Sequence, residues 1–225
     1  MNNKLVDLGN GLKFLQKQDA FRFGCDGVEL ANFVDGGPKD YAVDLGSGTG
    51  IITILLAGKR RIKTTAVEIQ DELCKVCQSN IELNGLSSLA DVINTPMQDI
   101  SKFLQAGCAD IVVCNPPYRK QGSGMKQLNE AIAIARHEIK VTLVEVASAA
   151  AYLLSTGGRF FTVNQTERLA EVIDVCRGVK LEPKKLQILT PNGTKKPHLF
   201  MLKCIKDGAP GLIVEREREV KVEVN

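Results

Sequence analysis

Asn115, Pro116, Pro117 and Tyr118 are the residues whose types and spacing most directly suggest chemistry in this sequence. They follow an apolar run, residues 110–114, that is typical of a buried parallel strand. Two prolines stiffen the turn that follows the strand. The Asn115 side-chain oxygen and the Pro116 carbonyl then face one point as acceptors, with the Tyr118 ring beside them. This arrangement predicts a pocket for a planar group that carries an amine.

A glycine-rich segment earlier in the chain suits a small charged ligand. Gly46, Gly48 and Gly50 allow a tight turn and let a ligand approach the backbone at the positive end of a helix. A dinucleotide fingerprint would place its third glycine at position 51, which is Ile51. The spacing therefore favours a ligand without a pyrophosphate, and Asp44 favours an ammonium group.

Two further acids are expected at the same edge of the structure. Glu68 ends a predicted strand, where an acidic side chain accepts hydrogen bonds from both hydroxyls of a ribose. Asp99 follows the next strand and is placed to bind the amino group of an adenine. An acid for an amine, one for a ribose and one for an adenine, without a phosphate cradle, describe S-adenosylmethionine.

The elements that position these residues alternate along the chain from residue 40 onward. Strands are predicted at residues 41–45, 63–69, 90–94, 110–114, 159–163, 185–190 and 199–205, and helices at 28–34, 51–58, 71–83, 141–154 and 167–176. This alternation predicts an α/β fold with a mostly parallel seven-stranded sheet and helices on both faces. The last two strands have no helix between them, so they should pair antiparallel at the edge. Ligands of such sheets bind at the carboxyl ends of the strands, near the switch point of strand order.

The composition is that of an ordinary soluble globule, with 44% hydrophobic and 24% charged residues among 225. We expect an N-terminal extension (residues 1–36) packing on the cofactor and substrate side, one main domain (37–206) and a charged C-terminal tail (207–225). The net charge of +3 permits a nucleic-acid partner without requiring one. Nothing in the sequence fixes the oligomeric state, and a monomer is the expectation.

The cysteines and the hydropathy pattern indicate in which cellular compartment the protein is expected. The seven cysteines form no disulfide framework, and Cys74 and Cys77 lack the second pair that a metal site needs, so no metal is expected. Reduced thiols indicate the cytoplasm. No secretory signal opens the chain, and no apolar run reaches the length of a membrane-spanning helix, so no membrane association is expected.

The motifs together resemble the class I S-adenosylmethionine-dependent methyltransferases that carry an Asn-Pro-Pro-Tyr motif. Within that group the chain is similar to the tRNA1(Val) (adenine-N6)-methyltransferases, because residues 21–30, 135–138 and 196–198 match elements of that family. The resemblance covers residues 10–205, and the tail departs from it. It implies a Rossmann-like fold, S-adenosylmethionine as cofactor, a tRNA partner, and methylation of the exocyclic N6 of the adenine next to the anticodon of tRNA(Val).

The resemblance also implies roles for individual residues. The catalytic residues would be Asn115, Pro116 and Tyr118. Cofactor binding is expected from Gly24, Asp26, Asp44, Gly46, Gly48, Gly50, Glu68, Ile69, Gln98, Asp99 and Asn115. RNA binding is expected from Arg22, Arg119, Lys120, Lys126 and Arg136.

Other functions fit parts of the pattern. A protein-glutamine amide would fit the same two acceptors, although relatives of that kind carry a separate helical domain before the sheet. Guanine N2 in ribosomal RNA is another target, often with Phe where this chain has Tyr118. From other classes, a catalytically inactive RNA-binding module is opposed by the intact acids and glycines. A nicotinamide oxidoreductase is opposed by Ile51.

Overall fold

The computed structural model describes residues 3–17, 25–116, 141–194 and 196–220. Its strands are β1 (Asn3–Gly9), β2 (Leu12–Lys17), β3 (Tyr41–Leu45), β4 (Lys63–Glu68), β5 (Ala90–Asn94), β6 (Ala109–Cys114), β7 (Leu154–Gln165), β8 (Leu181–Pro191), β9 (Leu199–Lys206), β10 (Ile213–Val214) and β11 (Arg218–Val220). Its helices are α1 (Cys25–Phe33), α2 (Ile51–Arg60), α3 (Asp71–Leu83), α5 (Leu143–Leu153), α6 (Leu169–Gly178) and the 3₁₀ helices η1 (Met97–Lys102) and η2 (Thr166–Arg168).

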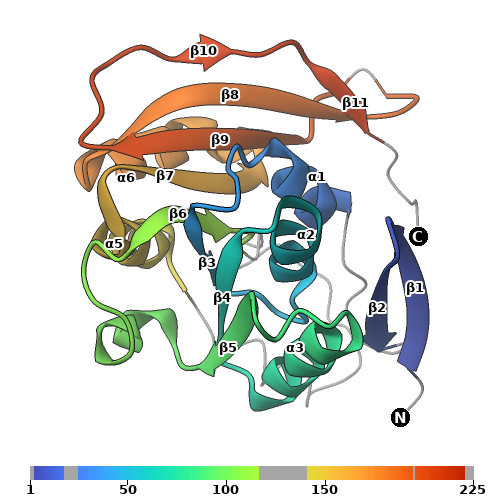
Figure 1. The fold of residues 1–225 in the computed structure, drawn as a ribbon. Coiled ribbons are helices and arrows are strands. Elements are labelled where there is room, and N and C mark those ends of the chain that lie inside the picture. Colours follow the sequence, from blue (N-terminus) through green and yellow to red (C-terminus); the bar gives the residue numbers. More distant parts are fainter. Residues whose placement is uncertain (1–2, 18–24, 117–140, 195, 221–225) are drawn as a thin grey trace, which may run out of the picture.

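The main sheet has the order β10-β8-β9-β7-β6-β3-β4-β5 (Figure 1). Strands β3, β4, β5, β6 and β7 pair parallel to one another. The chain runs from β3 outward to β5 and then returns to the other side of β3 through β6, so the switch point lies between β3 and β6. The predicted mostly parallel α/β sheet with helices on both faces is confirmed.

The sheet differs from the prediction at its far edge. β8 and β9 pair antiparallel as expected, but β9 lies between β7 and β8. The edge is instead occupied by β10 and β11, which come from residues 213–220 and pair parallel to β8. The main sheet therefore has nine strands where seven were predicted. An uncovered edge strand offers unpaired backbone groups to any extended segment that reaches it, and residues 215–219, which overlap β11, alternate in the sign of their charges.

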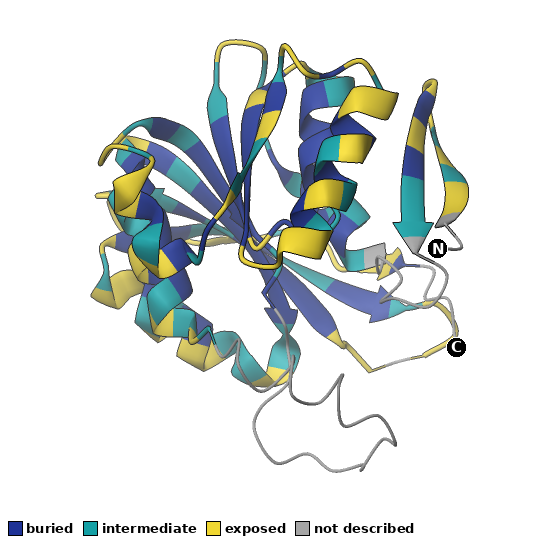
Figure 2. Cartoon of the chain, turned by 90° about the horizontal axis from the view of Figure 1, so that it is seen from below, coloured by how far each residue is buried: buried dark blue, intermediate teal, exposed yellow. Residues whose placement is uncertain are grey.

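The strands separate two hydrophobic cores because successive side chains point to opposite faces of the sheet. In β6, Ile111 and Val113 belong to the core beneath α1, α2 and α3. Val112 and Cys114 belong to the core beneath α5 and α6. Figure 2 shows the buried strands between helices whose outer surfaces are exposed. By this alternation, the next residue, Asn115, is expected to face the side of α1 and α2.

A two-stranded hairpin, β1–β2, packs outside the main sheet and was not predicted (Figure 1). Its turn contains Asn10 and Gly11, both with positive φ, a pair that favours a hairpin turn. Phe14 of β2 is fully buried in the core beneath α2 and α3. Asn80 of α3 accepts a hydrogen bond from the Leu15 amide at 2.6 Å and donates to the Leu15 carbonyl at 3.2 Å. The hairpin is therefore fixed to α3 through both backbone groups of one residue.

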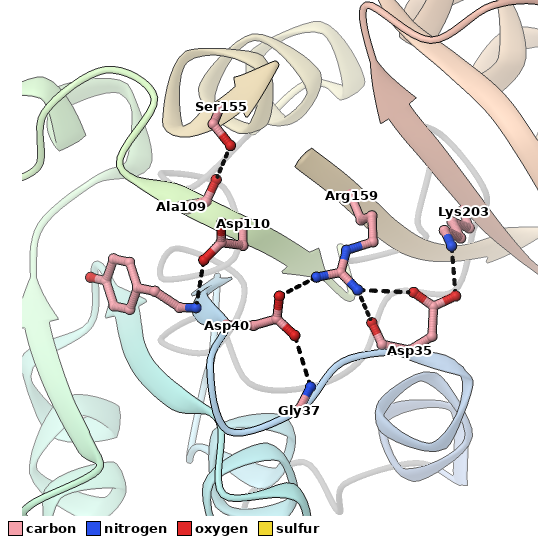
Figure 3. A network of polar contacts seen from close by, with 9 residues as sticks. Asp35, Gly37, Asp40, Ala109, Asp110, Ser155, Arg159 and Lys203 are labelled. Atoms are coloured by element: carbon pink, nitrogen blue, oxygen red, sulfur yellow. Dashed lines mark hydrogen bonds and ion pairs between the residues drawn. The ribbon is translucent and has the colours of Figure 1, made fainter. Parts of the chain in front are cut away.

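A network of ion pairs joins elements at the edge of the sheet where the parallel strands begin (Figure 3). Arg159 of β7 forms ion pairs with Asp40 and with Asp35, and it donates to the Asp35 carbonyl at 2.7 Å. Lys203 of β9 binds the other Asp35 carboxylate oxygen at 2.6 Å. The segment between α1 and β3 is thus tied to two strands that lie more than a hundred residues away in the sequence.

Candidate active site

The strand register places the predicted site residues at one edge of the sheet. Leu45 of β3 pairs with Val67 of β4 on one side and with Cys114 of β6 on the other. The residues that follow these three in the chain are Gly46, Glu68 and Asn115, so they lie at the same level, at or just after the ends of their strands. This edge is the carboxyl end of the parallel strands at the switch point, where such sheets bind their ligands.

The glycines of the loop after β3 differ in what surrounds them. Gly46, Gly48 and Gly50 all have positive φ, at 70°, 57° and 89°. A methyl group added to Gly50 would lie 2.5 Å from Sγ of Cys77 on α3, so this position is required for close packing. A methyl group added to Gly48 would meet no atom within 4 Å. Gly48 therefore borders open space, where a ligand can approach its backbone.

Glu68 is buried, and the backbone holds its carboxylate in place. Its Oε2 accepts a hydrogen bond from the Gly48 amide at 2.8 Å, and its Oε1 accepts one from the Gln70 amide at 2.9 Å. Each oxygen keeps a further lone pair. The two amides fix the direction of the carboxylate and leave it able to accept hydrogen bonds from a pair of neighbouring hydroxyls.

Asp44 is a buried acid with one unused oxygen. Its Oδ2 accepts hydrogen bonds from the Thr53 hydroxyl at 2.8 Å and the Thr53 amide at 3.2 Å, whereas Oδ1 is buried without a hydrogen-bond partner. Desolvation, opposed by Thr53 and assisted by the negative charge of Glu68, raises the pKa of Asp44 to about 7. Within the described part of the chain no cation forms an ion pair with Asp44. A ligand ammonium would supply the missing partner and the missing charge.

The segment after β5 packs against the glycine loop. A methyl group added to Gly46 would lie 3.8 Å from Cε of Met97 in η1. Asp99 is half-buried and forms an ion pair with Lys102 at 3.0 Å. The exposed Gln98 donates from Nε2 to Glu145 of α5 at 3.1 Å, so its amide nitrogen is engaged there.

Ile69 follows Glu68 and leaves an apolar surface at this edge, with 40% of the residue exposed. Its position is held by Asn94 at the end of β5, whose Nδ2 donates to the carbonyls of Glu68 and Ile69 at 3.0 Å each. The same Asn94 nitrogen lies 3.2 Å from Sγ of Cys74. An apolar side chain beside the fixed Glu68 carboxylate can pack against the face of a flat ring.

Asn115 and Pro116 stand at the end of β6, with Asn115 half-buried and Pro116 buried. A methyl group added to Gly27 of α1 would lie 3.7 Å from Nδ2 of Asn115 and 3.2 Å from Cγ2 of Ile51. The first turn of α1 therefore lies against both Asn115 and the start of α2, which places the neighbouring Asp26 near the same edge. Gly24, Pro117 and Tyr118 lie outside the described residues, as do Arg22, Arg119, Lys120, Lys126 and Arg136.

Comparison with known proteins identifies the family. Residues 30–179 match the methyltransferase small domain. The chain belongs to the methyltransferase small domain family. A tRNA1(Val) (adenine(37)-N6)-methyltransferase of Trichodesmium erythraeum is 30% identical over 168 residues, covering 71% of this chain and 69% of the relative. One of Shewanella sediminis is 27% identical over 191 residues, covering 80% and 78%.

Two solved structures of other proteins share the fold of this enzyme. A predicted O-methyltransferase of Agrobacterium tumefaciens has a TM-score of 0.67 at 18% identity, covering 88% of this chain and 86% of its own. TYW2 of Pyrococcus horikoshii, in complex with MeSAdo, has a TM-score of 0.66 at 16% identity, covering 92% and 72%. The methyltransferase is S-adenosylmethionine-dependent, and its orphaned Asp44 oxygen, open Gly48 and fixed Glu68 fit that cofactor.

Three residues that support the site were not identified from the sequence. Thr53 orients Asp44, Asn94 fixes the chain after Glu68, and Asn80 donates to the Thr49 carbonyl in the glycine loop at 3.0 Å. Only Asn80 leaves a signal in the sequence, because an Asn on the apolar side of a helix needs buried partners. Among the described residues, no group of acids, thiols and imidazoles is arranged to hold a metal, and no helix is long and apolar enough to cross a membrane.

Proposed function

We propose that this methyltransferase transfers a methyl group to the exocyclic N6 of adenine 37, next to the anticodon, in tRNA1(Val). The observation that carries the proposal is the placement of Asn115 and Pro116 at the switch point, level with Gly46 and Glu68. Two hydrogen-bond acceptors for an amine, the Asn115 side-chain oxygen and the Pro116 carbonyl, then lie beside the glycine loop. The named activity of the relatives from Trichodesmium erythraeum and Shewanella sediminis supports the choice of adenine N6 and of tRNA.

The acids at the ends of β3 and β4 would hold the cofactor. Asp44 would bind the ammonium through Oδ1, and Glu68 would accept hydrogen bonds from the ribose hydroxyls. Ile69, Asp99 and Gln98 would contact the adenine, and Asp26 of α1 would contact the amino-acid part. When bound, S-adenosylmethionine supplies an activated methyl group on its sulfonium. Because the methyl group is already activated, alignment and electrostatics provide most of the catalysis.

The acceptors at the end of β6 prepare the target nitrogen. The lone pair of adenine N6 is shared with the ring, so the amine is a weak nucleophile. Hydrogen bonds from the two N6 hydrogens to Asn115 Oδ1 and to the Pro116 carbonyl draw the nitrogen toward tetrahedral geometry and direct its lone pair at the methyl group. They also stabilise the positive charge that develops on N6 before it releases a proton. Stacking of the extruded base on Tyr118 stays a prediction.

The decisive experiment uses radiolabelled S-adenosylmethionine with separate acceptors: transcribed tRNA1(Val), the same tRNA with guanine at position 37, ribosomal RNA and a release factor. We expect label in the first acceptor and none in the second. Label confined to the release factor or to ribosomal RNA would refute the proposal in favour of a glutamine or guanine target.

A variant of Asn115 tests the assigned chemistry. Asn115→Ala should lower kcat by about 100-fold or more, as the loss of one oxyanion-hole donor does elsewhere, and leave the Kd for S-adenosylmethionine within about twofold. The matched control is Asn32→Ala, which removes an exposed amide from α1. Equal loss of cofactor affinity and rate in Asn115→Ala would contradict the role in target binding.

A further inference from the structure

A cavity of about 250 Å³ opens between the end of β7 and the loop that joins β8 to β9. Its lining includes Gln165, Thr166, Glu167, Lys196, Pro197 and His198. Its two walls are joined by backbone contacts: the Thr166 amide donates to the His198 carbonyl at 3.1 Å, and the His198 amide donates to the Leu189 carbonyl at 3.1 Å. The cavity is therefore a built feature of the fold, fixed to both β7 and β8.

The cavity lies at the same edge of the sheet as the methyl-transfer site. Thr162 of β7 pairs with Cys114, the residue before Asn115, and the strand continues for three residues to Gln165 at the cavity wall. With about 3.3 Å per residue along a strand and about 4.8 Å between strands, Cys114 and Gln165 are roughly 11 Å apart. A nucleic-acid strand whose base enters the pocket at Asn115 would carry its neighbouring nucleotides past this cavity.

The lining has the chemistry of a nucleotide site. Lys196 and His198 are exposed and stand on one wall, where an ammonium and an imidazole can contact a phosphodiester. The rings of Pro197 and His198 present flat surfaces to a base. Glu167 stands on the opposite wall. Its carboxylate repels a free, highly charged anion such as a polyphosphate. The same carboxylate can accept a hydrogen bond from a base amine or a ribose hydroxyl.

We propose that this cavity binds a nucleotide of the RNA strand that flanks the target adenine, with its phosphate on Lys196 and His198. The inference rests on the proposed function, because it takes RNA as the substrate. It assigns part of the RNA affinity to the end of the β8–β9 loop, which is separate from the residues that hold the cofactor and the target base.

The test uses three variants: the double variant Lys196→Ala/His198→Ala, the single variant Lys196→Arg, and the control Lys59→Ala. Lys59 is an exposed lysine at the end of α2, on the opposite edge of the sheet. Binding of transcribed tRNA1(Val) is measured by fluorescence anisotropy between about 50 and 300 mM KCl, where phosphate contacts set the salt dependence. The double variant should bind about tenfold more weakly, with a salt slope reduced by about 1 for the lost lysine contact. Lys196→Arg and Lys59→Ala should behave as the wild type.

The outcomes separate this inference from the proposed function. If the wild type methylates tRNA and the double variant binds tRNA with unchanged affinity and salt slope, the cavity proposal is overturned while the proposed function stands. If the wild type places no label in tRNA, the proposed function fails, and the cavity proposal fails with it. Calorimetry with S-adenosylmethionine checks the fold, because a variant altered only at this cavity keeps the wild-type cofactor Kd.

Discussion

The Glu68 carboxylate accepts a hydrogen bond from the Gly48 amide at 2.8 Å, which joins the end of β4 to the middle of the glycine loop. The second Glu68 oxygen accepts from the Gln70 amide at 2.9 Å. One side chain thus orders the loop after β3 and the turn after β4. The acid assigned to the ribose is also the residue that shapes the backbone around the cofactor.

Glu68→Gln tests this double role. A carboxamide has one oxygen, so its NH₂ group must face either the Gly48 or the Gln70 amide, and one buried donor loses its acceptor. Such a loss costs about 1–3 kcal/mol, and we expect the Kd for S-adenosylmethionine, measured by calorimetry, to rise about tenfold or more. The control is Glu82→Gln on the exposed side of α3. Unchanged affinity in Glu68→Gln would show that the carboxylate does not hold the loop or the cofactor.

Asp44 should make the stability of the free protein depend on pH. Because burial raises its pKa from 3.8 to about 7, the folded state binds the proton more tightly than the unfolded chain. The free energy of unfolding should therefore fall as the pH rises from about 4 to about 7, by on the order of 4 kcal/mol from this group. Urea denaturation across this range should show that Asp44→Asn loses most of this slope.

Thr53→Val provides the companion to Asp44→Asn. The Thr53 hydroxyl lowers the pKa of Asp44, so its removal should raise that pKa further and extend the loss of stability to higher pH. Bound S-adenosylmethionine should act in the opposite direction, because an ammonium beside Oδ1 favours the carboxylate. A stability profile that is the same in Asp44→Asn and the wild type would contradict the assignment.

Gly27→Val should slow the reaction without unfolding the protein. Even a methyl group on Gly27 would lie 3.2 Å from Cγ2 of Ile51 and 3.7 Å from Nδ2 of Asn115, and the branched side chain is larger. A displacement of Asn115 of the order of 1 Å can cost about 100-fold in rate. The measurement is kcat with tRNA, and Gly37→Val is the control, because a methyl group there meets nothing within 4 Å. A wild-type kcat in Gly27→Val would mean that α1 does not position Asn115.

Asn80→Ala should release the β1–β2 hairpin. Asn80 is fully buried, and its loss leaves the Leu15 amide and carbonyl and the Thr49 carbonyl without this partner. We expect a loss of about 2–4 kcal/mol in the free energy of unfolding. Faster hydrogen exchange at the Leu15 amide would locate the effect in the hairpin. Ser79→Ala, on the exposed side of the same helix, should change neither quantity.

Arg159→Met should separate stability from cofactor binding. Arg159 forms ion pairs with two aspartates at the amino-terminal edge of the sheet (Figure 3), whereas the site lies at the carboxyl edge. Removing one partner of a half-buried network leaves its charges unbalanced, so we expect the melting temperature to fall by several degrees, corresponding to about 1–3 kcal/mol. The Kd for S-adenosylmethionine should stay at the wild-type value. A parallel rise in that Kd would indicate that the two edges of the sheet are coupled.

The sequence predicted the part of the site that depends on local pattern. Apolar runs mark the strands, and the polar residues at or just after the end of each run stand at the strand ends, so the sequence places Asp44, Glu68 and Asn115 at one edge. Parallel pairing makes this inference possible, because the carboxyl ends of neighbouring parallel strands meet at the same edge. Asn10 and Gly11 are also a local hairpin signal in the sequence.

The sequence alone determined the α/β fold class, the glycine loop after β3 and the position of Asn115 at the end of β6, because each follows from residues that are neighbours in the chain. Only the tertiary structure decided that β10 and β11 lie beside β8 at the edge of the sheet and that β9 lies between β7 and β8. The same holds for the attachment of the hairpin through Asn80. It also decided that Gly50 is required by Cys77, whereas Gly48 faces open space. These features depend on contacts between segments far apart in the chain, whose pairing is set by packing and leaves no periodic trace in the sequence.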